Sequence, residues 1–249
     1  MNLLIDFGNT RLKWARLDGG RLQPGGAFVH AGRALGPLLG REWSGLGAVD
    51  AVLVASVVAA ARERELGDDV RGRFGVRAEF VRSPAAALGV RNAYAEPERL
   101  GVDRFLALVA LHADAPRALV HVGVGTALTL DALAADGAHL GGLILPGPRL
   151  MREAVLGGTA RVGAVDGQWS EMPQSTADAV FSGALCAASG AIDRFRVAAE
   201  RRLGAPPALL VSGGGADELV PLVAGAERRH DLVLHGLARW AADPPAHAG

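Results

Sequence analysis

The first residues with clear chemical potential lie near the start of the chain, where a carboxylate, a glycine turn and a lysine follow one another. Asp6 ends an apolar run, Gly8-Asn9-Thr10 forms a tight turn, and Lys13 lies on the returning segment. A glycine turn lets backbone N–H groups approach phosphate oxygens closely. Asn9 and Thr10 add side-chain donors, Lys13 adds a positive charge, and Asp6 can hold Mg²⁺ or its water. The spacing predicts a phosphate-handling hairpin, although Gly-Asn turns also occur in ordinary hairpins.

A second group with chemical potential lies at residues 92–104, where Asp103 and Arg104 follow a glycine. An aspartate at a helix start could accept a proton from a substrate hydroxyl. The neighbouring arginine could clamp a carboxylate with two hydrogen bonds. A salt bridge on a helix surface is the alternative interpretation of the same pair. With the hairpin, this group indicates phosphoryl transfer from ATP to a hydroxylated acid.

The hairpin pattern occurs a second time at residues 121–131, as a β-type run, a Gly-Thr turn and another β-type run. Aligning Gly8 with Gly125 places Gly123 where the first hairpin has Asp6. Two related hairpins predict a duplicated α/β domain with a ligand cleft between the halves, since clefts between domains are common ligand sites.

The segment 114–116 is typical of a linker, and it divides the chain into expected domains at 1–114 and 115–249. The strands expected besides the hairpins are 51–58, 143–145 and 208–211. The helices expected are 62–66, 99–113, 149–156, 176–196 and one that starts at Ala216. This alternation favours an α/β fold.

Two glycine-containing segments carry further expectations. A strand that ends in the glycine run 212–215 and opens a helix is suited to a nucleotide base or ribose lying against backbone. In the segment 176–196, Gly183 and Gly190 are expected to allow close helix packing, and Cys186 is expected to be buried.

Composition excludes several functional classes. The chain has 249 residues, of which 50% are hydrophobic, and its 26 Lys and Arg balance its 26 Asp and Glu. This balance lacks the basic bias of a nucleic-acid binder. One cysteine permits no intrachain disulfide and fits a reducing compartment. We therefore expect a cytoplasmic protein with no nucleic-acid or membrane partner, because no cleavable leader and no apolar run of about 20 residues is present. The seven His and one Cys show no metal-ligand spacing.

Short motifs in a fixed order along most of the chain resemble those of the type III pantothenate kinases. This family belongs to the superfamily of acetate and sugar kinases, Hsp70 and actin. The motifs are Asp6-Phe7-Gly8-Asn9-Thr10 through Lys13, Ser56-Val57-Val58, Tyr94 with Leu100-Gly101-Val102-Asp103-Arg104, Gly125-Thr126-Ala127 with Thr129 and Asp131, Gly141-Gly142-Leu143-Ile144-Leu145-Pro146-Gly147 with Leu150, Ser175-Thr176 with Gly183, and Ser212-Gly213-Gly214. The resemblance implies two ribonuclease H-like α/β domains with the active site in the cleft between them.

The resemblance also implies an activity and roles for individual residues. The activity is ATP-dependent phosphorylation of pantothenate to 4′-phosphopantothenate, the first step of coenzyme A biosynthesis, by a homodimer that uses Mg²⁺. The implied ATP-binding residues are Asp6, Phe7, Gly8, Asn9, Thr10, Arg11, Leu12, Lys13 and Thr126, with Asp6 near Mg²⁺. The implied pantothenate-binding residues are Tyr94, Gly101, Val102, Asp103, Arg104 and Thr176, the last across the subunit interface. Asp103 is implied to accept the hydroxyl proton.

One departure from the family pattern concerns the second phosphate motif, which usually reads Asp-x-Gly-Thr with the Asp ligating a monovalent cation. Gly123 takes the place of that Asp here, so a K⁺ or NH₄⁺ site loses a charged ligand. Activation by these cations is then lost, or Asp131 substitutes, or phosphoryl transfer itself is weak. Smaller departures are Ser212 in place of Thr, and Pro173-Gln174 in place of Gly-Asn.

Two other functions are compatible with these residues. A regulatory or scaffold protein, like the Bvg accessory factors of this family, could keep the nucleotide-binding fold without turnover. A kinase for another hydroxy acid would share the same fold, since fold does not fix substrate.

Overall fold

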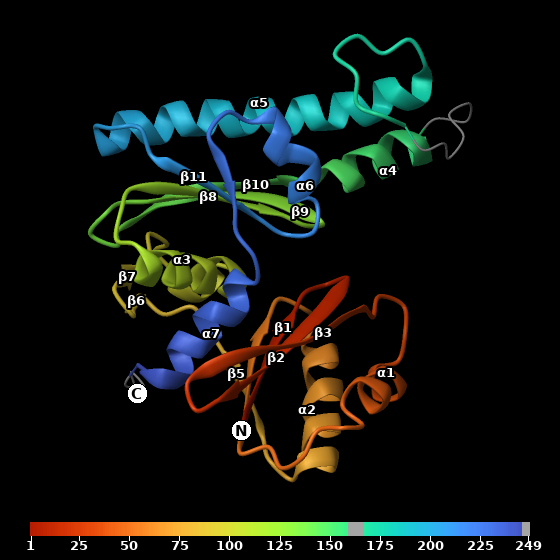
Figure 1. Ribbon diagram of the computed structural model, residues 1–249, viewed down its shortest axis with the longest axis vertical. Coiled ribbons are helices and arrows are strands. Elements are labelled where there is room, and N and C mark those ends of the chain that lie inside the picture. The colour runs from red at the N-terminus through yellow and green to blue at the C-terminus, as the bar shows by residue number, and fades with distance from the viewer. Residues whose placement is uncertain (159–166, 246–249) are drawn as a thin grey trace. The chain divides into compact units, whose positions relative to one another are not determined.

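The computed structural model describes residues 1–158 and 167–245, which form two compact units. The first unit consists of Met1–Ala115 together with Leu232–Gly249, and the second is Pro116–Asp231 (Figure 1).

The first unit is built on a five-stranded sheet in the order β3-β2-β1-β4-β5. The strands are β1 (Asn2–Phe7), β2 (Arg11–Asp18), β3 (Arg21–Val29), β4 (Ala51–Ser56) and β5 (Ala78–Val81). β1 pairs antiparallel with β2 and parallel with β4, so the first hairpin lies at the centre of the sheet. A small hairpin of β6 (Ala86–Ala87) and β7 (Val90–Arg91) follows, with a 3-10 turn at Pro97–Arg99.

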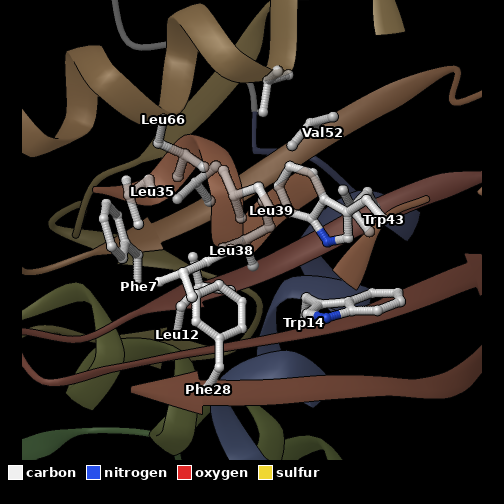
Figure 2. Close-up of a cluster of buried hydrophobic side chains, with 14 of the residues drawn as sticks. Phe7, Leu12, Trp14, Phe28, Leu35, Leu38, Leu39, Trp43, Val52 and Leu66 are labelled. Carbon is white, nitrogen blue, oxygen red and sulfur yellow. The ribbon is translucent and has the colours of Figure 1, made fainter. Parts of the chain in front are cut away.

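Helices cover this sheet and bury apolar side chains. Figure 2 shows Phe7, Leu12 and Phe28 from the strands packed with Leu35 and Leu39 from α1 (Leu35–Glu42). Helix α2 (Ala60–Phe74) adds its own apolar residues to this cluster. Because side chains alternate along a strand, the residues of β1 between the core positions belong to the opposite face.

The C-terminal helix α7 (Leu232–Ala242) is part of the first unit, whereas the division at residue 115 assigned it to the second. It packs on α3 (Val102–Asp114), β1 and β4. Gly236 makes the contact between α7 and α3 possible, because a Cβ atom there would collide with the backbone carbonyl of Leu106. Apolar packing decides which unit this helix joins. The two repeated hairpins, on which the expected division was based, do not indicate where the helix packs.

The second unit contains another five-stranded sheet, in the order β10-β9-β8-β11-β12. Its strands are β8 (Leu119–Val124), β9 (Ala127–Leu133), β10 (His139–Pro146), β11 (Ala208–Ser212) and β12 (Ala226–Arg228). Its helices are α4 (Pro148–Gly158), α5 (Thr176–Leu203) and α6 (Ala216–Leu219), with a 3-10 turn at Val220–Leu222. In chain order both sheets run third, second, first, fourth, fifth, which confirms the predicted duplication.

The predicted helices and strands are present, with different ends. The helix expected at 99–113 begins only at Val102, because Gly101 is its N-cap residue and a 3-10 turn precedes it. The helix expected at 176–196 continues to Leu203, where Gly204 ends it in a left-handed conformation.

The expectation that Cys186 is buried was wrong, and the close packing expected at Gly183 and Gly190 is not found within this chain. Cys186 is exposed, and a Cβ atom at Gly183 or Gly190 would have no neighbour within 4 Å. Small residues at helical spacing predict a helix surface that suits close packing. They do not predict whether another segment of the same chain packs on that surface. Among the described residues, no helix is long and apolar enough to cross a membrane.

Candidate functional site

The first hairpin places a carboxylate beside an ammonium group at one end of the sheet. Asp6 on β1 lies directly opposite Lys13 on β2 in the antiparallel register. Side chains of directly paired residues lie on the same face of a sheet. The turn between them closes with a hydrogen bond of 3.1 Å from the Gly8 N–H to the Arg11 carbonyl. The hairpin can therefore present a carboxylate, a cation and turn amides together.

Not every residue of this hairpin can reach a ligand with its side chain. Phe7 and Leu12 are 0% exposed and belong to the core cluster. Asn9 and Arg11 are exposed, and Thr10 is half-buried. Phe7 and Leu12 thus anchor the turn, and they can meet a ligand only through their backbone.

Asp103 lies in the first turn of α3, two residues after the N-cap residue Gly101. Its Oδ1 accepts a hydrogen bond of 2.9 Å from the backbone N–H of Arg104. The positive end of the helix dipole favours a carboxylate at this position. Val102, between the two, is buried and fixes the start of the helix in the core.

Arg104 is buried rather than at the surface, so a surface salt bridge does not describe it. The residue is only 4% exposed, and its guanidinium donates a 3.1 Å hydrogen bond to the hydroxyl of Tyr94. The guanidinium carbon also lies 5.8 Å from the centre of the Tyr94 ring. A buried arginine with an aromatic neighbour is suited to holding an anionic group.

Asn92 and Ser83 fasten this segment, and the sequence had not assigned them a role. The Asn92 side chain accepts from the Tyr94 N–H at 3.0 Å and donates to the carbonyls of Pro84 and Pro97 at 3.2 and 2.9 Å. The buried Ser83 hydroxyl donates to the Leu100 carbonyl at 2.7 Å. The only sequence signal was that asparagine commonly bonds backbone groups two residues away in turns.

In the second unit, the Gly-Thr turn is closed by the segment that follows β10. The Gly125 N–H donates to the Ala127 carbonyl, and the Gly147 N–H donates to the Thr126 carbonyl, each at 2.9 Å. A Cβ atom at position 147 would collide with the Gly125 carbonyl, so this contact requires glycine.

The glycine run after β11 packs on the same hairpin. Gly213 has a φ of +99°, and a Cβ atom there would collide with the carbonyl of Val124. That carbonyl accepts a 3.1 Å hydrogen bond from the Gly215 N–H. The Arg228 guanidinium fixes the run by donating to the Gly213 carbonyl at 2.8 Å. Three motifs that are distant in sequence therefore meet at one edge of the second sheet.

The surroundings of Gly123 do not fit a charged cation ligand. Gly123 lies opposite Thr129 on β9 and Ser212 on β11, and a Cβ atom on it would lie 2.6 Å from the Thr129 hydroxyl. Asp131 does not supply the missing carboxylate, because it is 0% exposed and its Oδ1 lies 2.9 Å from Nε2 of His139. Among the described residues, no group of three or more His, Cys, Asp or Glu side chains could hold a metal ion.

Thr176 is exposed at the first position of α5, directly after the N-cap residue Ser175. The Ser175 hydroxyl donates to the Asp178 carboxylate at 2.7 Å and accepts from the Asp178 N–H at 3.1 Å. Asp178 also accepts from the Gln168 N–H at 2.8 Å. The bond from Gln168, and then the bond from Ser175, lower the pKa of Asp178. The segment before Thr176 is thereby tied to the helix.

Comparisons with known proteins match most of the chain to one family. The sequence profile of the type III pantothenate kinase family matches residues 2–198. The type III pantothenate kinase of Stenotrophomonas maltophilia strain K279a is 44% identical over 243 residues, covering 98% of each chain. That of Xanthomonas campestris pv. campestris strain 8004 is 44% identical over 238 residues, covering 96% of each.

Solved structures resemble the fold at much lower identity. A Baf family protein of Campylobacter jejuni has a TM-score of 0.63 at 18% identity, covering 98% of this chain and 100% of its own. A Sinorhizobium meliloti protein described as a 2-dehydro-3-deoxygalactonokinase has a TM-score of 0.61 at 14% identity, covering 99% and 98%. These likenesses confirm the predicted fold of the sugar kinase and actin superfamily.

Proposed function

The chain belongs to the type III pantothenate kinase family, and from this premise we propose how its residues transfer a phosphoryl group from ATP to pantothenate. The chain is a kinase, and its product, 4′-phosphopantothenate, enters coenzyme A biosynthesis.

We assign proton removal from the pantothenate hydroxyl to Asp103. The observation that carries this assignment is that Gly101, which has no side chain, leaves the space that the Asp103 carboxylate occupies at the start of α3. A carboxylate held at a helix start has the position and charge that a general base needs. Phosphoryl transfer otherwise needs alignment and charge stabilisation rather than covalent help from the protein.

We assign the pantothenate carboxylate to Arg104, supported by Tyr94. Arg104 is buried and already oriented by the Tyr94 hydroxyl, so little rotamer entropy is lost when it binds an anion. Gly101 and Val102 would contribute backbone to the same site, and exposed Thr176 would contact pantothenate across the subunit interface of a dimer.

We assign the ATP phosphates to the hairpin residues Asp6 to Lys13 and to Thr126 of the second hairpin. The pairing of Asp6 with Lys13 supports this, because both side chains lie on one face beside a glycine turn. Asp6 fits Mg²⁺ as well, since magnesium in such sites is held by one or two carboxylates and by phosphate oxygens. Bound there, Mg²⁺ would offset the charge that develops on the phosphates. The surroundings of Gly123 support no charged ligand for K⁺ or NH₄⁺, so we propose that turnover needs neither cation.

We propose that the active form is a homodimer joined along α5. From Thr176 to Gly190 the exposed face of α5 carries small side chains at helical spacing, namely Thr176, Ala179, Gly183, Cys186, Ala187 and Gly190. The same unit exposes Ile144 on β10 and Leu150 on α4. A second copy is the favoured occupant, because homodimers are the commonest oligomers and a formal net charge of zero does not repel a second copy. The cytoplasmic location stays a prediction.

The experiment that tests the function measures ADP release from ATP and Mg²⁺ with pantothenate, and with a panel of other hydroxylated acids. We expect release that requires pantothenate and that falls in Asp103→Asn. Release with a different acid alone would assign another acceptor. No release from folded protein that still binds ATP would favour the regulatory alternative.

A further inference from the structure

His30, which follows β3, contacts both ends of the first phosphate turn. Its backbone N–H donates to the Thr10 carbonyl at 3.1 Å, and its Nε2 lies 2.7 Å from the Gly8 carbonyl oxygen. The side chain is buried, and its ring packs on Phe7 with 4.9 Å between ring centres. One residue therefore holds the carbonyl groups on both sides of Asn9.

The partners of the His30 ring fix which nitrogen carries the hydrogen. A carbonyl oxygen can only accept, so Nε2 must donate to Gly8. A guanidinium can only donate, and an Arg62 nitrogen lies 3.0 Å from Nδ1 of His30, so Nδ1 must accept. The ring is thus a neutral imidazole with one hydrogen on Nε2, and both of its nitrogens are used.

Arg62 is itself held in place by helices α1 and α2. Its guanidinium donates to Glu65 at 2.5 Å, one helical turn further along α2. The other oxygen of Glu65 accepts from the Leu35 N–H at the start of α1, at 2.7 Å. A continuous series of hydrogen bonds therefore connects both helices to the Gly8 carbonyl.

We propose that His30 is a positioning residue for ATP binding, and that Arg62 and Glu65 act through it. This inference rests on the proposed role of the hairpin in holding ATP phosphates. Carbonyl oxygens that faced the phosphates would repel them, whereas backbone N–H groups attract them. The two bonds to His30 hold the Gly8 and Thr10 carbonyls toward the histidine, so that the turn presents its N–H groups to an anion.

Kinetic constants separate positioning of ATP from a general structural role. His30→Leu removes the side-chain bond while keeping an apolar body of similar size, and we expect KM for ATP to rise roughly 10-fold. KM for pantothenate should stay near the wild-type value. His30→Gln should recover most of the loss, because its amide can donate to Gly8 and accept from Arg62.

Arg62→Met has a matched control on the same helix. Arg73 also connects α2 to α1, through a 2.8 Å bond to the Gly36 carbonyl, but it does not bond His30. We expect Arg62→Met to raise KM for ATP and Arg73→Met to leave it unchanged. Equal effects of the two variants, or a His30→Gln variant as impaired as His30→Leu, would overturn the proposal.

Direct binding keeps this test separate from the proposed kinase activity. Calorimetric titration with Mg²⁺ and the non-hydrolysable analogue ADPNP needs no turnover, and His30→Leu should weaken binding by the same factor as KM. If wild-type protein binds the analogue but releases no ADP with pantothenate, the proposed function fails. The titration of His30→Leu with the analogue then still tests the role of His30. Unchanged binding in a folded His30→Leu variant would refute the proposal.

Discussion

Gly101 makes room for the carboxylate of Asp103, since a Cβ atom on the glycine would lie 2.6 Å from Oδ1 of the aspartate. The backbone of Gly101 has φ −51° and ψ 127°, which any residue can adopt. An alanine at this position would therefore displace the end of a flexible side chain and leave the fold intact.

We expect Gly101→Ala to lower kcat by about 10- to 100-fold, because the base loses its alignment. The melting temperature should stay close to that of wild type. Gly72→Ala is the matched control. Gly72 lies on α2, and a Cβ atom there would have no neighbour within 4 Å. Steady-state kinetics and thermal melts measure these two effects. A Gly101→Ala enzyme with normal kcat would contradict the assignment of Asp103 as the general base.

Asp103→Asn keeps the shape of the side chain and removes its basicity. We expect kcat to fall by roughly 10²- to 10⁴-fold, the usual contribution of a general base. ADPNP binding, measured by calorimetry, should remain near normal because the phosphate hairpin is unchanged. Near-normal turnover in the folded variant would mean that another group accepts the proton.

We expect pantothenate-dependent turnover to be equal in K⁺, NH₄⁺ and Na⁺ buffers, because Gly123 and the buried Asp131 provide no charged ligand. Gly123→Asp combined with Thr129→Ala would add a carboxylate and remove the hydroxyl that lies 2.6 Å from the added Cβ atom. This double variant should gain thermal stabilisation by K⁺ over Na⁺, which wild type should lack. A wild-type enzyme that requires K⁺ would show that other oxygens form the site.

Glu63 and Arg82 give a prediction for pH. The Arg82 hydrogen bond is the main cause that lowers the pKa of Glu63 below its ordinary value of 4.5. A lowered pKa in the folded state means that the pair stabilises the protein above pH 4.5 and loses this contribution as the pH falls below it. Because Arg82 is 54% exposed, the coupling should be no more than about 1 kcal/mol. A double-mutant cycle of Glu63→Gln and Arg82→Gln, run by denaturant unfolding at pH 7 and pH 3.5, should show a smaller coupling at the lower pH.

The α5 interface can be tested with two glycines that have equal space around them. A Cβ atom at Gly183 or at Gly72 meets nothing within 4 Å, so an arginine fits at either position in the single chain. We expect Gly183→Arg to convert a dimer into monomers and Gly72→Arg to leave the dimer intact, as measured by sedimentation velocity. A monomeric wild type, or a dimeric Gly183→Arg protein, would contradict the proposed interface.

The sequence predicted those parts of the fold that depend on residues close together in the chain. The two hairpins follow from alternating apolar runs around glycine turns, and the shared strand order confirms the duplication that they suggested. The contacts of Gly147 and Gly213 with the second hairpin were not predicted, because no local pattern reports which distant segments meet. The roles assigned to Asp103, Arg104 and Thr126 stay predictions.

What depends on long-range contacts could not be predicted. The sequence pattern around Cys186 predicted a helix, but it could not predict whether other parts of the chain cover the side of the helix on which Cys186 lies. The roles of His30 and Asn92 could not be predicted from the sequence. Each depends on a contact with the backbone carbonyl of another segment, Gly8 for His30 and Pro97 for Asn92. The pairing of α7 with α3 joins the end of the chain to its middle, and no local pattern reports that contact.

That pairing has a consequence for the order of events during synthesis. The second unit is continuous in sequence, so it has all of its residues before the chain is finished. The first unit emerges from the ribosome earlier, yet it must wait for Leu234, Leu237 and Trp240, which bury their side chains only when the last helix arrives. The unit that begins to emerge earlier is therefore completed later, after the unit inserted within it can already have folded.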